Sequence, residues 1–417
     1  MLDGALAAAC EQALARWNVP GAAIGVLAGG ETAIQGFGVL DLRTGEPVTA
    51  ESTFRIASIT KPFTATLALY LSLSGLLALD EEVPGPVEGL TPQHLLSHLG
   101  GFEGECGDLA RFGEGDDALP RLGAELAAQP QIVPPDEVWS YCNAGFWLLG
   151  QFLADRAGST YEQTLADWVL NPLRLSHTGF GPPGATGHVQ TEPGGSAHEP
   201  VNAGYPRARN ASGGLVSNVG DLLEFARFHL ENRETEVLRR PVVDTPGGDY
   251  GFGFWLERLD ELELWGHTGS YGGFESRLLL EPESGFAFAG LTNSGRGSVA
   301  LEEILDTVLE QVLGVRREPP ETVPLPAAEL ALLAGSYRNP ELEVELRPEG
   351  DRLLVEAVEI DRVSGVRTAS PPVRARSLGA RLFALEGDEW ERVRFDFHPR
   401  AGAPRFVRFG SRLAERR

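Results

Sequence analysis

The chain has 417 residues, of which 42% are hydrophobic, so it is long enough for two or three domains and can bury a full core. Its formal charge of −24 would repel phosphate backbones and anionic lipid, which argues against nucleic-acid binding and against attachment to a membrane surface. Three cysteines are too sparse for a disulfide framework, and no histidine or cysteine spacing fits a metal site, so we expect no metal and no cofactor.

The N-terminal segment predicts an amphipathic helix. Its apolar residues fall on one helical face, at Leu6, Cys10, Ala13, Leu14 and Trp17. The run that ends at Cys10 also resembles a lipoprotein cleavage box, but no basic residue precedes it and its apolar stretch is too short. No other run reaches the length that spans a membrane. We therefore expect a cytoplasmic protein.

Two stretches of the chain predict antiparallel strand pairs. Strands at 22–28 and 32–38 are joined by Gly29-Gly30, a turn typical of hairpins. Strand character returns towards residue 250, and strands at 274–280 and 286–292 predict a second hairpin. The first part of the chain is therefore expected to contain an antiparallel sheet.

Helical spacing dominates the region between these strand pairs, at about 75–235. Ahead of it, Ser58 begins a long apolar helix that runs to about Leu73, and Pro62 is tolerated because it lies in the first turn. A further amphipathic helix is predicted at 301–312. Shorter helices are expected near 91–98, 117–128, 143–157, 160–169 and 219–231.

The pattern of the sequence changes after a proline-rich segment at 316–326, which we interpret as a linker. Beyond it, apolar and polar residues alternate strictly, as in Val344-Glu345-Leu346 and Phe395-Asp396-Phe397. Alternation with a period of two is typical of strands with one buried face. It predicts a separate all-β module, either a small barrel or a sandwich.

Only one of the 35 basic residues is a lysine, Lys61. Arginine is never deprotonated in a protein, whereas a lysine amine can lose its proton. Ser58 lies three residues earlier, so both side chains share one face of the predicted helix, whose N-terminal dipole favours the neutral amine. A neutral amine beside a hydroxyl gives an activated serine nucleophile. The plain alternative is that Ser58 only caps the helix.

Two further motifs follow Ser58 and Lys61 in chain order. Tyr141-Cys142-Asn143 precedes a predicted helix, and His267-Thr268-Gly269-Ser270 is expected between two strands. The three motifs together resemble the serine β-lactamase and penicillin-binding protein superfamily, in the branch of the class C β-lactamases, the D-stereospecific peptidases and related esterases. The resemblance covers about residues 1–315, and the β module resembles the lipocalin-like appendages of some members. Further stretches that look like this branch lie at 95–101, 171–180 and 211–217.

The resemblance implies an α+β fold. Its β-lactamase/transpeptidase-like antiparallel sheet would be flanked by helices, with the mostly helical subdomain at about 75–235 and a small C-terminal β-barrel. A serine hydrolase domain would then occupy 1–315, a linker 316–326 and a β-barrel or lipocalin-like domain 327–417. Such an enzyme would need no cofactor, and its partner would be a small-molecule or peptide substrate.

The resemblance also implies roles for the residues of the three motifs. Ser58 would be the acylated nucleophile, and Lys61 and Tyr141 would move its proton as general base and acid. The backbone N–H groups of Ser58 and Ser270 would form the oxyanion hole. His267 and Thr268 would line the site and tune Tyr141. Substrate binding and the oxyanion site would together involve Asn143, His267, Thr268, Gly269 and Ser270.

One departure from the family pattern bears on the substrate. The third motif begins with His267, where a lysine would help to hold the carboxylate of a β-lactam, and a mostly neutral imidazole does so less well. We therefore expect hydrolysis of esters or of D-amino-acid peptides and amides, with weak or no β-lactamase activity. Two alternatives stay open: an efficient β-lactamase or DD-carboxypeptidase, and a non-catalytic binding or scaffold protein on the same fold.

A rival interpretation comes from Gly295-Arg296-Gly297-Ser298-Val299-Ala300, which fits the dinucleotide-binding pattern between a strand and a helix. No second parallel strand with an acidic end is predicted after it, which argues against nucleotide binding. The chain also lacks a Gly-x-Ser-x-Gly motif, so a hydrolase triad of that kind is not available. His98 and His177 are expected to make structural hydrogen bonds.

Overall fold

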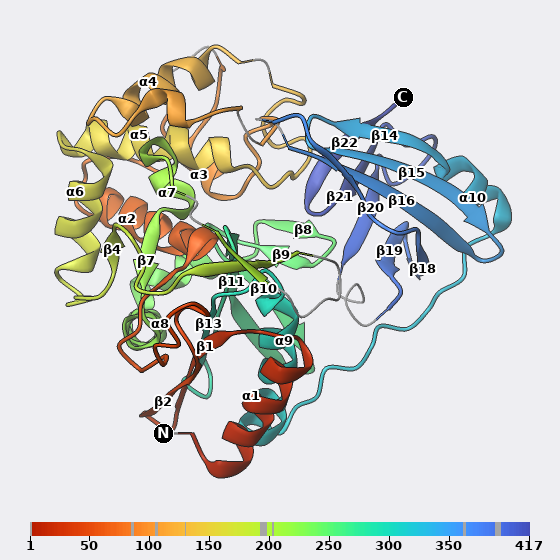
Figure 1. Cartoon of the computed structure of the whole chain (residues 1–417). Helices are drawn as coiled ribbons and strands as arrows, with labels where there is room; N and C mark the ends of the chain where they lie inside the picture. Colours follow the sequence, from red (N-terminus) through yellow and green to blue (C-terminus); the bar gives the residue numbers. More distant parts are fainter. Residues whose placement is uncertain are drawn as a thin grey trace.

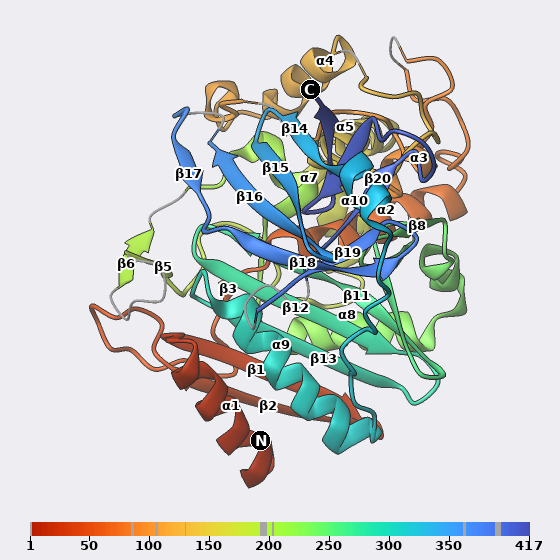
Figure 2. The same cartoon turned by 90° about the vertical axis from the view of Figure 1, so that its right-hand side faces the viewer.

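The computed structural model describes residues 2–84, 87–104, 107–129, 131–191, 198–201, 204–361, 364–387 and 393–417. Figure 1 shows a body of helices and sheet, with a blue barrel joined to it by one extended segment. Figure 2, turned by 90°, places the barrel in front of the sheet. The predicted α+β class and the C-terminal barrel are confirmed.

Among the described residues, eight strands form an antiparallel sheet in the order β2-β1-β13-β12-β11-β10-β9-β8. Both predicted hairpins are confirmed: β1 (Gly21–Ala28) pairs with β2 (Glu31–Gly38), and β12 (Phe274–Glu281) pairs with β13 (Phe286–Thr292). The two glycines of the first turn have φ angles of 57° and 82°, the left-handed region that a tight turn needs. The other strands are β8 (Val243–Thr245), β9 (Gly248–Tyr250), β10 (Trp255–Leu259) and β11 (Leu262–Tyr271).

The helices α1 (Gly4–Arg16) and α9 (Gly297–Val308) pack together on one face of this sheet (Figure 1). The predicted apolar face of α1 is confirmed, because its residues are buried in a cluster shared with α9 and the sheet. The helix predicted at 301–312 is also confirmed, with α9 continuing through the π turn η6 (Leu309–Leu313). The buried residues on this face of α1 and at its C-terminal end are Leu6, Cys10, Ala13, Leu14 and Trp17.

The strand before the candidate dinucleotide motif rules against that interpretation. β13 runs antiparallel to both β1 and β12. Dinucleotide binding at a glycine-rich turn depends on a parallel strand–helix–strand unit. The residues at 295–300 instead form the start of a helix that packs on the back of an antiparallel sheet.

The helical region packs against the opposite face of the sheet, around α2 (Thr60–Leu73). Every residue from 60 to 69 is buried, including the polar Thr60, Lys61, Thr64 and Thr66, so α2 is enclosed on all sides. The five shorter predicted helices are confirmed, and the one expected near 160–169 is α6 followed by the π turn η3 (Ala166–Leu170). The surrounding helices are α3 (Pro92–Leu96), α4 (Ala118–Ala127), α5 (Asn143–Ala157), α6 (Tyr161–Leu165), α7 (Asn210–Gly213) and α8 (Val219–Glu231).

Short strands and turns connect the helical region to the sheet. β3 (Phe54–Arg55) and β4 (Gly179–Phe180) both pair with β7 (Leu215–Ser217), and β5 (Gly187–Gln190) pairs with β6 (His198–Val201). The remaining 3-10 turns are η1 (Ala57–Ile59), η2 (Ala110–Phe112), η4 (Arg207–Arg209) and η5 (Arg233–Arg239).

In the part of the chain that the structure describes, eight C-terminal strands close into a barrel because β15 pairs with both β14 and β16. The predicted alternation is confirmed, since Val344, Leu346, Phe395 and Phe397 lie in its buried core. α10 (Ala327–Leu333) packs against the barrel core, and we propose 316–326 as the boundary between the two bodies. The eight barrel strands are β14 (Gly335–Asn339), β15 (Leu342–Glu349), β16 (Arg352–Ile360), β18 (Val373–Gly379), β19 (Leu382–Leu385), β20 (Arg394–His398), β21 (Phe406–Phe409) and β22 (Arg412–Arg416), and the short β17 (Arg367–Ala369) pairs with the end of β16.

Two local predictions are wrong. The third motif does not lie between strands, because β11 continues through it and pairs with β12 as far as Tyr271. Its glycine marks a close approach of two backbones rather than the end of a strand. The long helix does not begin at Ser58 either: a 3-10 turn, η1, holds Ser58, and the α-helix begins at Thr60. Among the described residues, no helix is long and apolar enough to cross a membrane.

Candidate active site

The nucleophile candidate and the single lysine are in direct contact. Lys61 Nζ donates to Ser58 Oγ at 3.0 Å and to the carbonyl of Ser212 at 2.9 Å. The Lys61 side chain is fully buried, with 0% of its surface exposed. The helix N-cap position is Ile59 and no side chain caps it, so the alternative that Ser58 only caps the helix is wrong. The Ser58 hydroxyl therefore lies within hydrogen-bond distance of an amine that could exchange a proton with it.

Backbone geometry fixes the turn that carries Ser58. Ala57, the preceding residue, has a φ of 45°, a left-handed conformation that costs about 1–2 kcal/mol for a residue with a Cβ atom. β11 lies against this turn at Gly269, where a Cβ atom would come within 2.1 Å of the Ile56 carbonyl oxygen. Ser276 Oγ donates to the same oxygen at 2.9 Å. The sheet thus supports the turn that carries Ser58, and Gly269 permits the close approach of β11 to this turn.

Tyr141 lies on the other side of the lysine. The Tyr141 ring centroid is 4.8 Å from Lys61 Nζ. Tyr141 directly precedes α5, whose N-terminus is capped by the Cys142 thiol, which accepts a hydrogen bond from the Gly145 N–H at 3.2 Å. Cys142 is buried, Cys10 is a free and buried thiol, and Cys106 lies outside the described residues. Cys142 therefore orients the start of α5 beside Tyr141.

A chain of buried hydrogen bonds connects the Tyr141 segment to β11. His98 Nδ1 accepts from the Cys142 N–H at 3.0 Å, so its Nε2 carries the proton and donates to Tyr250 OH at 3.1 Å. Tyr250 OH in turn donates to His267 Nε2, 3.4 Å away, because His267 Nδ1 donates to the Thr268 carbonyl at 2.5 Å. Burial and the nearby Lys61 amine lower the pKa of His267 to about 3, and burial lowers the pKa of His98 well below its usual value. Both imidazoles are therefore neutral near pH 7. The structural hydrogen bonds expected of His98 are confirmed.

We expect Tyr250→Phe to destabilise the fold. Tyr250 is fully buried, and loss of its hydroxyl leaves the His98 Nε2–H donor and the His267 Nε2 acceptor without partners. Two unsatisfied buried groups should lower the free energy of unfolding by about 2–4 kcal/mol, measured by urea denaturation. Tyr271→Phe is the matched control, because its hydroxyl donates to Gly204 in an exposed position. A decrease in the free energy of unfolding as small as that of the control would mean that these hydrogen bonds do not contribute to stability.

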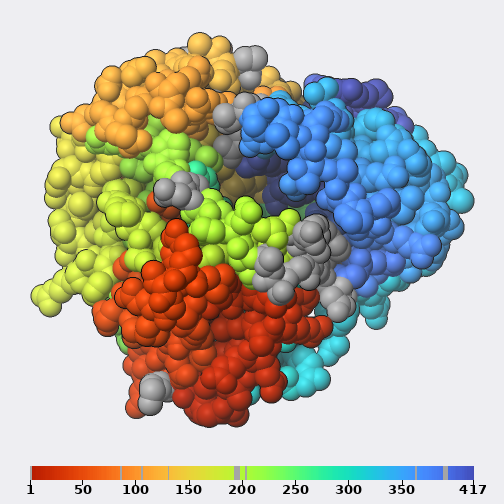
Figure 3. Space-filling model, viewed as in Figure 1, coloured from red at the N-terminus to blue at the C-terminus, as the bar shows by residue number. Residues whose placement is uncertain are grey.

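The residues of the three motifs line one cleft of about 870 Å³ (Figure 3 shows the hollow between the barrel and the helical region). Lys61 lies beneath its floor against Ser58, and Gly269 lies within β11 against the nucleophile turn. The structure thus brings all eight predicted site residues into one region. Those that line the cleft are Ser58, Tyr141, Asn143, His267, Thr268 and Ser270.

The opposite wall of the cleft comes from the C-terminal barrel, which the sequence analysis treated as a separate module. Asn339, Glu341 and Arg412 of the barrel line the cleft. The Tyr141 N–H donates to the Ser411 carbonyl at 2.9 Å, so the barrel contacts the backbone of a predicted catalytic residue. No local pattern in the sequence could have indicated this contact, because it joins segments about 270 residues apart.

A buried ion pair lies where the barrel meets the helical region. Arg408 donates from Nε and Nη2 to the two carboxylate oxygens of Asp396, at 2.8 and 2.5 Å. Both side chains are at least 95% buried, and the guanidinium lies 5.4 Å from the Trp139 ring. Trp139 stands two residues before Tyr141, so this contact fixes the barrel close to the cleft. Both partners of this bidentate pair belong to the barrel, on β20 and β21, so the pair fixes the orientation of the guanidinium that meets Trp139.

Glu275 is a site residue that the sequence analysis missed. It lies directly across from Ser270 in the β11–β12 pair, and Ser270 Oγ donates to its carboxylate at 2.5 Å. Burial raises the pKa of Glu275 to about 8, so the carboxyl is largely protonated at neutral pH. The hairpin that was predicted at 274–292 places residues of β11 opposite β12, so register alone could have pointed to it.

We expect Glu275→Gln to make the free energy of unfolding less sensitive to alkaline pH. Between about pH 4.5 and 8 the folded protein keeps a proton on Glu275 that the unfolded chain releases, so the wild-type protein loses stability as pH rises. Glutamine stays neutral and can still accept from Ser270. The variant should gain about 1–3 kcal/mol relative to wild type between pH 4 and pH 9, less than the full pKa shift implies, because part of the Glu275 side chain is exposed to solvent. Urea unfolding across this range measures the difference, and a difference that does not change with pH contradicts the assignment.

No metal centre accompanies the cleft in the described part of the chain, where no three His, Cys, Asp or Glu side chains are grouped to hold an ion. His177, the other histidine considered above, is tied to α8 by its backbone N–H, which donates to Asp221 at 2.8 Å.

Comparison with known proteins agrees with this geometry. The profile of the family described as Beta-lactamase matches residues 6–312. Penicillin-binding protein 4 of Amycolatopsis lactamdurans is 31% identical over 364 residues, which cover 77% of this chain and 94% of that protein. A D-aminopeptidase of Gluconobacter oxydans is 28% identical over 382 residues, covering 82% of this chain and 68% of that protein.

Solved structures extend the similarity to the barrel. The crystal structure of SurE matches with a TM-score of 0.78 and 26% identity, covering 99% of this chain and 98% of that one. A D-stereospecific amidohydrolase from Streptomyces matches with a TM-score of 0.58 and 26% identity, covering 72% of this chain and 97% of that one. Because the family profile covers most of its length and a relative is 31% identical, the chain belongs to the β-lactamase family and is a serine hydrolase.

Proposed function

We propose that the protein hydrolyses esters, or amides and peptides of D-amino acids, through an acyl-enzyme on Ser58, with weak or no β-lactamase activity. The observation that carries the proposal is the buried Lys61 amine 3.0 Å from Ser58 Oγ, with the Tyr141 ring 4.8 Å from the same amine. Similarity to a D-aminopeptidase and a D-stereospecific amidohydrolase supports an acyl donor of D configuration.

The proposed reaction has two steps. In the first, Lys61 and Tyr141 take the proton of Ser58 Oγ as it attacks the carbonyl carbon, and they pass the proton to the leaving alcohol or amine. The backbone N–H groups of Ser58 and Ser270 donate to the oxyanion, and the Asn143 amide donates to the carbonyl of the acyl portion and to Lys61. In the second step Lys61 and Tyr141 take a proton from a water molecule as it attacks the ester carbonyl on Ser58, and they return the proton to Ser58 Oγ as the acid leaves.

His267 supports the lower expectation for β-lactams. A pKa of about 3 leaves its imidazole uncharged at neutral pH, and its two nitrogens are already engaged with Tyr250 and Thr268. Neither nitrogen is placed to supply the permanent cation that would hold the carboxylate of a β-lactam. A penicillin-binding activity is the second candidate, favoured by the identity to penicillin-binding protein 4.

A substrate panel with intact-mass detection tests the proposal. We expect a fluorophosphonate to add once at Ser58, and D-alanine p-nitroanilide to be cleaved with a kcat/KM at least about tenfold above that of the L form. Benzylpenicillin should acylate slowly or not at all. Equal rates on both enantiomers would remove the D preference, penicillin turnover faster than ester turnover would favour the β-lactamase alternative, and no adduct with any reagent would favour the scaffold alternative.

A further inference from the structure

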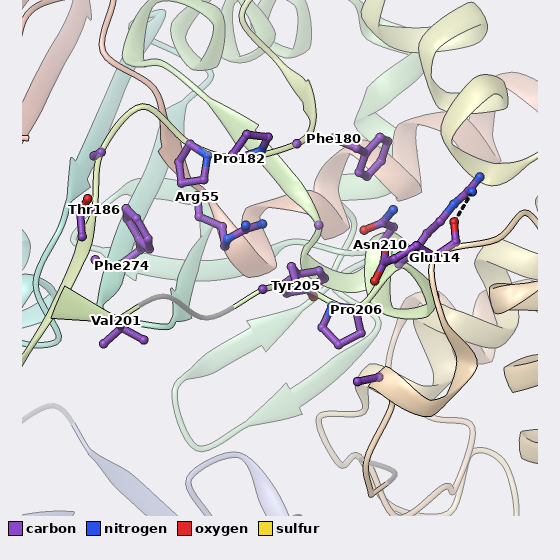
Figure 4. Close-up of a pocket in the computed structure, with 18 of the residues that line it drawn as sticks. Arg55, Glu114, Phe180, Pro182, Thr186, Val201, Tyr205, Pro206, Asn210 and Phe274 are labelled. Carbon is purple, nitrogen blue, oxygen red and sulfur yellow. Dashed lines mark hydrogen bonds between the residues drawn. The ribbon is translucent and has the colours of Figure 1, made fainter.

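A second pocket of about 1140 Å³ lies on the far side of the nucleophile turn (Figure 4). It shares no lining residue with the catalytic cleft. Arg55, three residues before Ser58, forms part of its wall, together with the aromatic rings of Phe180, Tyr205 and Phe274. Figure 4 shows the Arg55 side chain pointing towards the middle of the ring of labelled residues. We call this space the Arg55 pocket.

Arg55 differs from the other arginines of this pocket. Arg207 pairs with Asp116 at 2.7 Å and with Glu162 at 3.2 Å, and Arg43 pairs with Asp41 at 2.6 Å. Arg55 is only 7% exposed, yet among the described residues no carboxylate pairs with it. Its guanidinium lies 5.3 Å from the Tyr205 ring centroid, and burial lowers its pKa. Among the described residues it is therefore a buried cation that lies near an aromatic ring and has no carboxylate partner.

A buried cation without a partner is costly, because taking a charge out of water costs several kcal/mol that only an opposite charge offsets. A planar guanidinium presents donors in a fork that matches the two oxygens of a carboxylate. The rings of Phe180 and Phe274 offer apolar contact area beside that fork. Charge and walls together fit an anion with an apolar body better than a bare inorganic ion.

We propose that the Arg55 pocket binds a small organic carboxylate with an aryl or alkyl body, held by the Arg55 guanidinium and separate from the site of acyl transfer. The body of the ligand contacts the aromatic walls, and its carboxylate supplies the missing counter-charge. The site does not depend on the proposed hydrolysis, since no residue of the catalytic cleft takes part in it.

Isothermal titration of the full chain with phenylacetate tests the site. Phenylacetate is expected to bind, phenylacetamide, its neutral counterpart, at least about tenfold more weakly, and inorganic phosphate more weakly than phenylacetate. Arg55→Gln should weaken phenylacetate binding at least about tenfold, whereas Arg43→Gln, at an arginine that lines the same pocket but is already paired, should leave it within about twofold.

Three results would overturn the proposal: equal affinity for the acid and the amide, unchanged binding in Arg55→Gln, or phosphate binding in preference to phenylacetate. Gly181→Trp gives an independent test if Arg55→Gln does not fold. Gly181 lines the pocket, and a Cβ atom there meets open space, so the indole should occupy part of the pocket and weaken binding. Full binding by a folded Gly181→Trp chain would place the ligand elsewhere.

Discussion

Ser58→Ala is expected to abolish hydrolysis of a short-chain p-nitrophenyl ester, by a factor of roughly 10³ or more in kcat, because the covalent intermediate can no longer form. The fold should survive, since the side-chain contact that Ser58 makes is the one with Lys61 and the helix is not capped by it. Initial rates with p-nitrophenyl acetate measure the effect, and thermal unfolding checks the fold.

The matched control for that experiment is Ser270→Ala. The proposed role of Ser270 rests on its backbone N–H, and among the described residues its hydroxyl donates to Glu275. Ser270→Ala should therefore keep activity within about tenfold of wild type. Full activity in a folded Ser58→Ala chain would refute the acyl-enzyme at this position, and an equal loss in both variants would show that the cleft is sensitive to any change.

Lys61→Arg is expected to be nearly as damaging as Lys61→Ala, with a loss of roughly 10²-fold or more in kcat/KM. Arginine keeps the positive charge but cannot take a proton from Ser58. The site also leaves little room, because Lys61 is fully buried and its amine is shared between Ser58 Oγ and the Ser212 carbonyl. Steady-state rates on the same ester give the comparison, with circular dichroism to confirm that both variants fold.

The conservative and the severe substitution at Lys61 separate two explanations. If the amine acts as a base, charge does not rescue function and the two variants lose similar amounts of activity. If the amine only provides a positive charge near the oxyanion, Lys61→Arg should retain near-native turnover while Lys61→Ala does not. The second pattern would contradict the role proposed for the single lysine of the chain.

Local spacing predicted the contact between Ser58 and Lys61. Ser58 and Lys61 meet because three residues of a helical turn bring their side chains to one face, whether the turn is 3-10 or α. The hairpins and the amphipathic helices could also be predicted, since their hydrophobic periods and turn residues lie close together in the sequence. The start of the α-helix was predicted wrongly at Ser58 because Ala57 adopts a left-handed conformation, which an alanine in the sequence does not indicate.

What could not be predicted depends on contacts between distant segments. The His98–Tyr250–His267 hydrogen bonds join three separate elements, and each residue alone looks like an ordinary buried side chain. The barrel was expected as a module, but its contact with Tyr141 through Ser411 follows from docking of two folded surfaces. No periodic pattern encodes which loop of a barrel faces a cleft.

The burial of Lys61 has a practical consequence for chemical labelling. Because the chain has no other lysine, acylating reagents such as N-hydroxysuccinimide esters can modify one side-chain amine, and that amine is 0% exposed in the folded state. Its modification then requires the helical region to open around α2. The rate at which a side-chain label appears, resolved from the α-amino group by peptide mass mapping, would report how often the catalytic core opens in an otherwise unaltered protein.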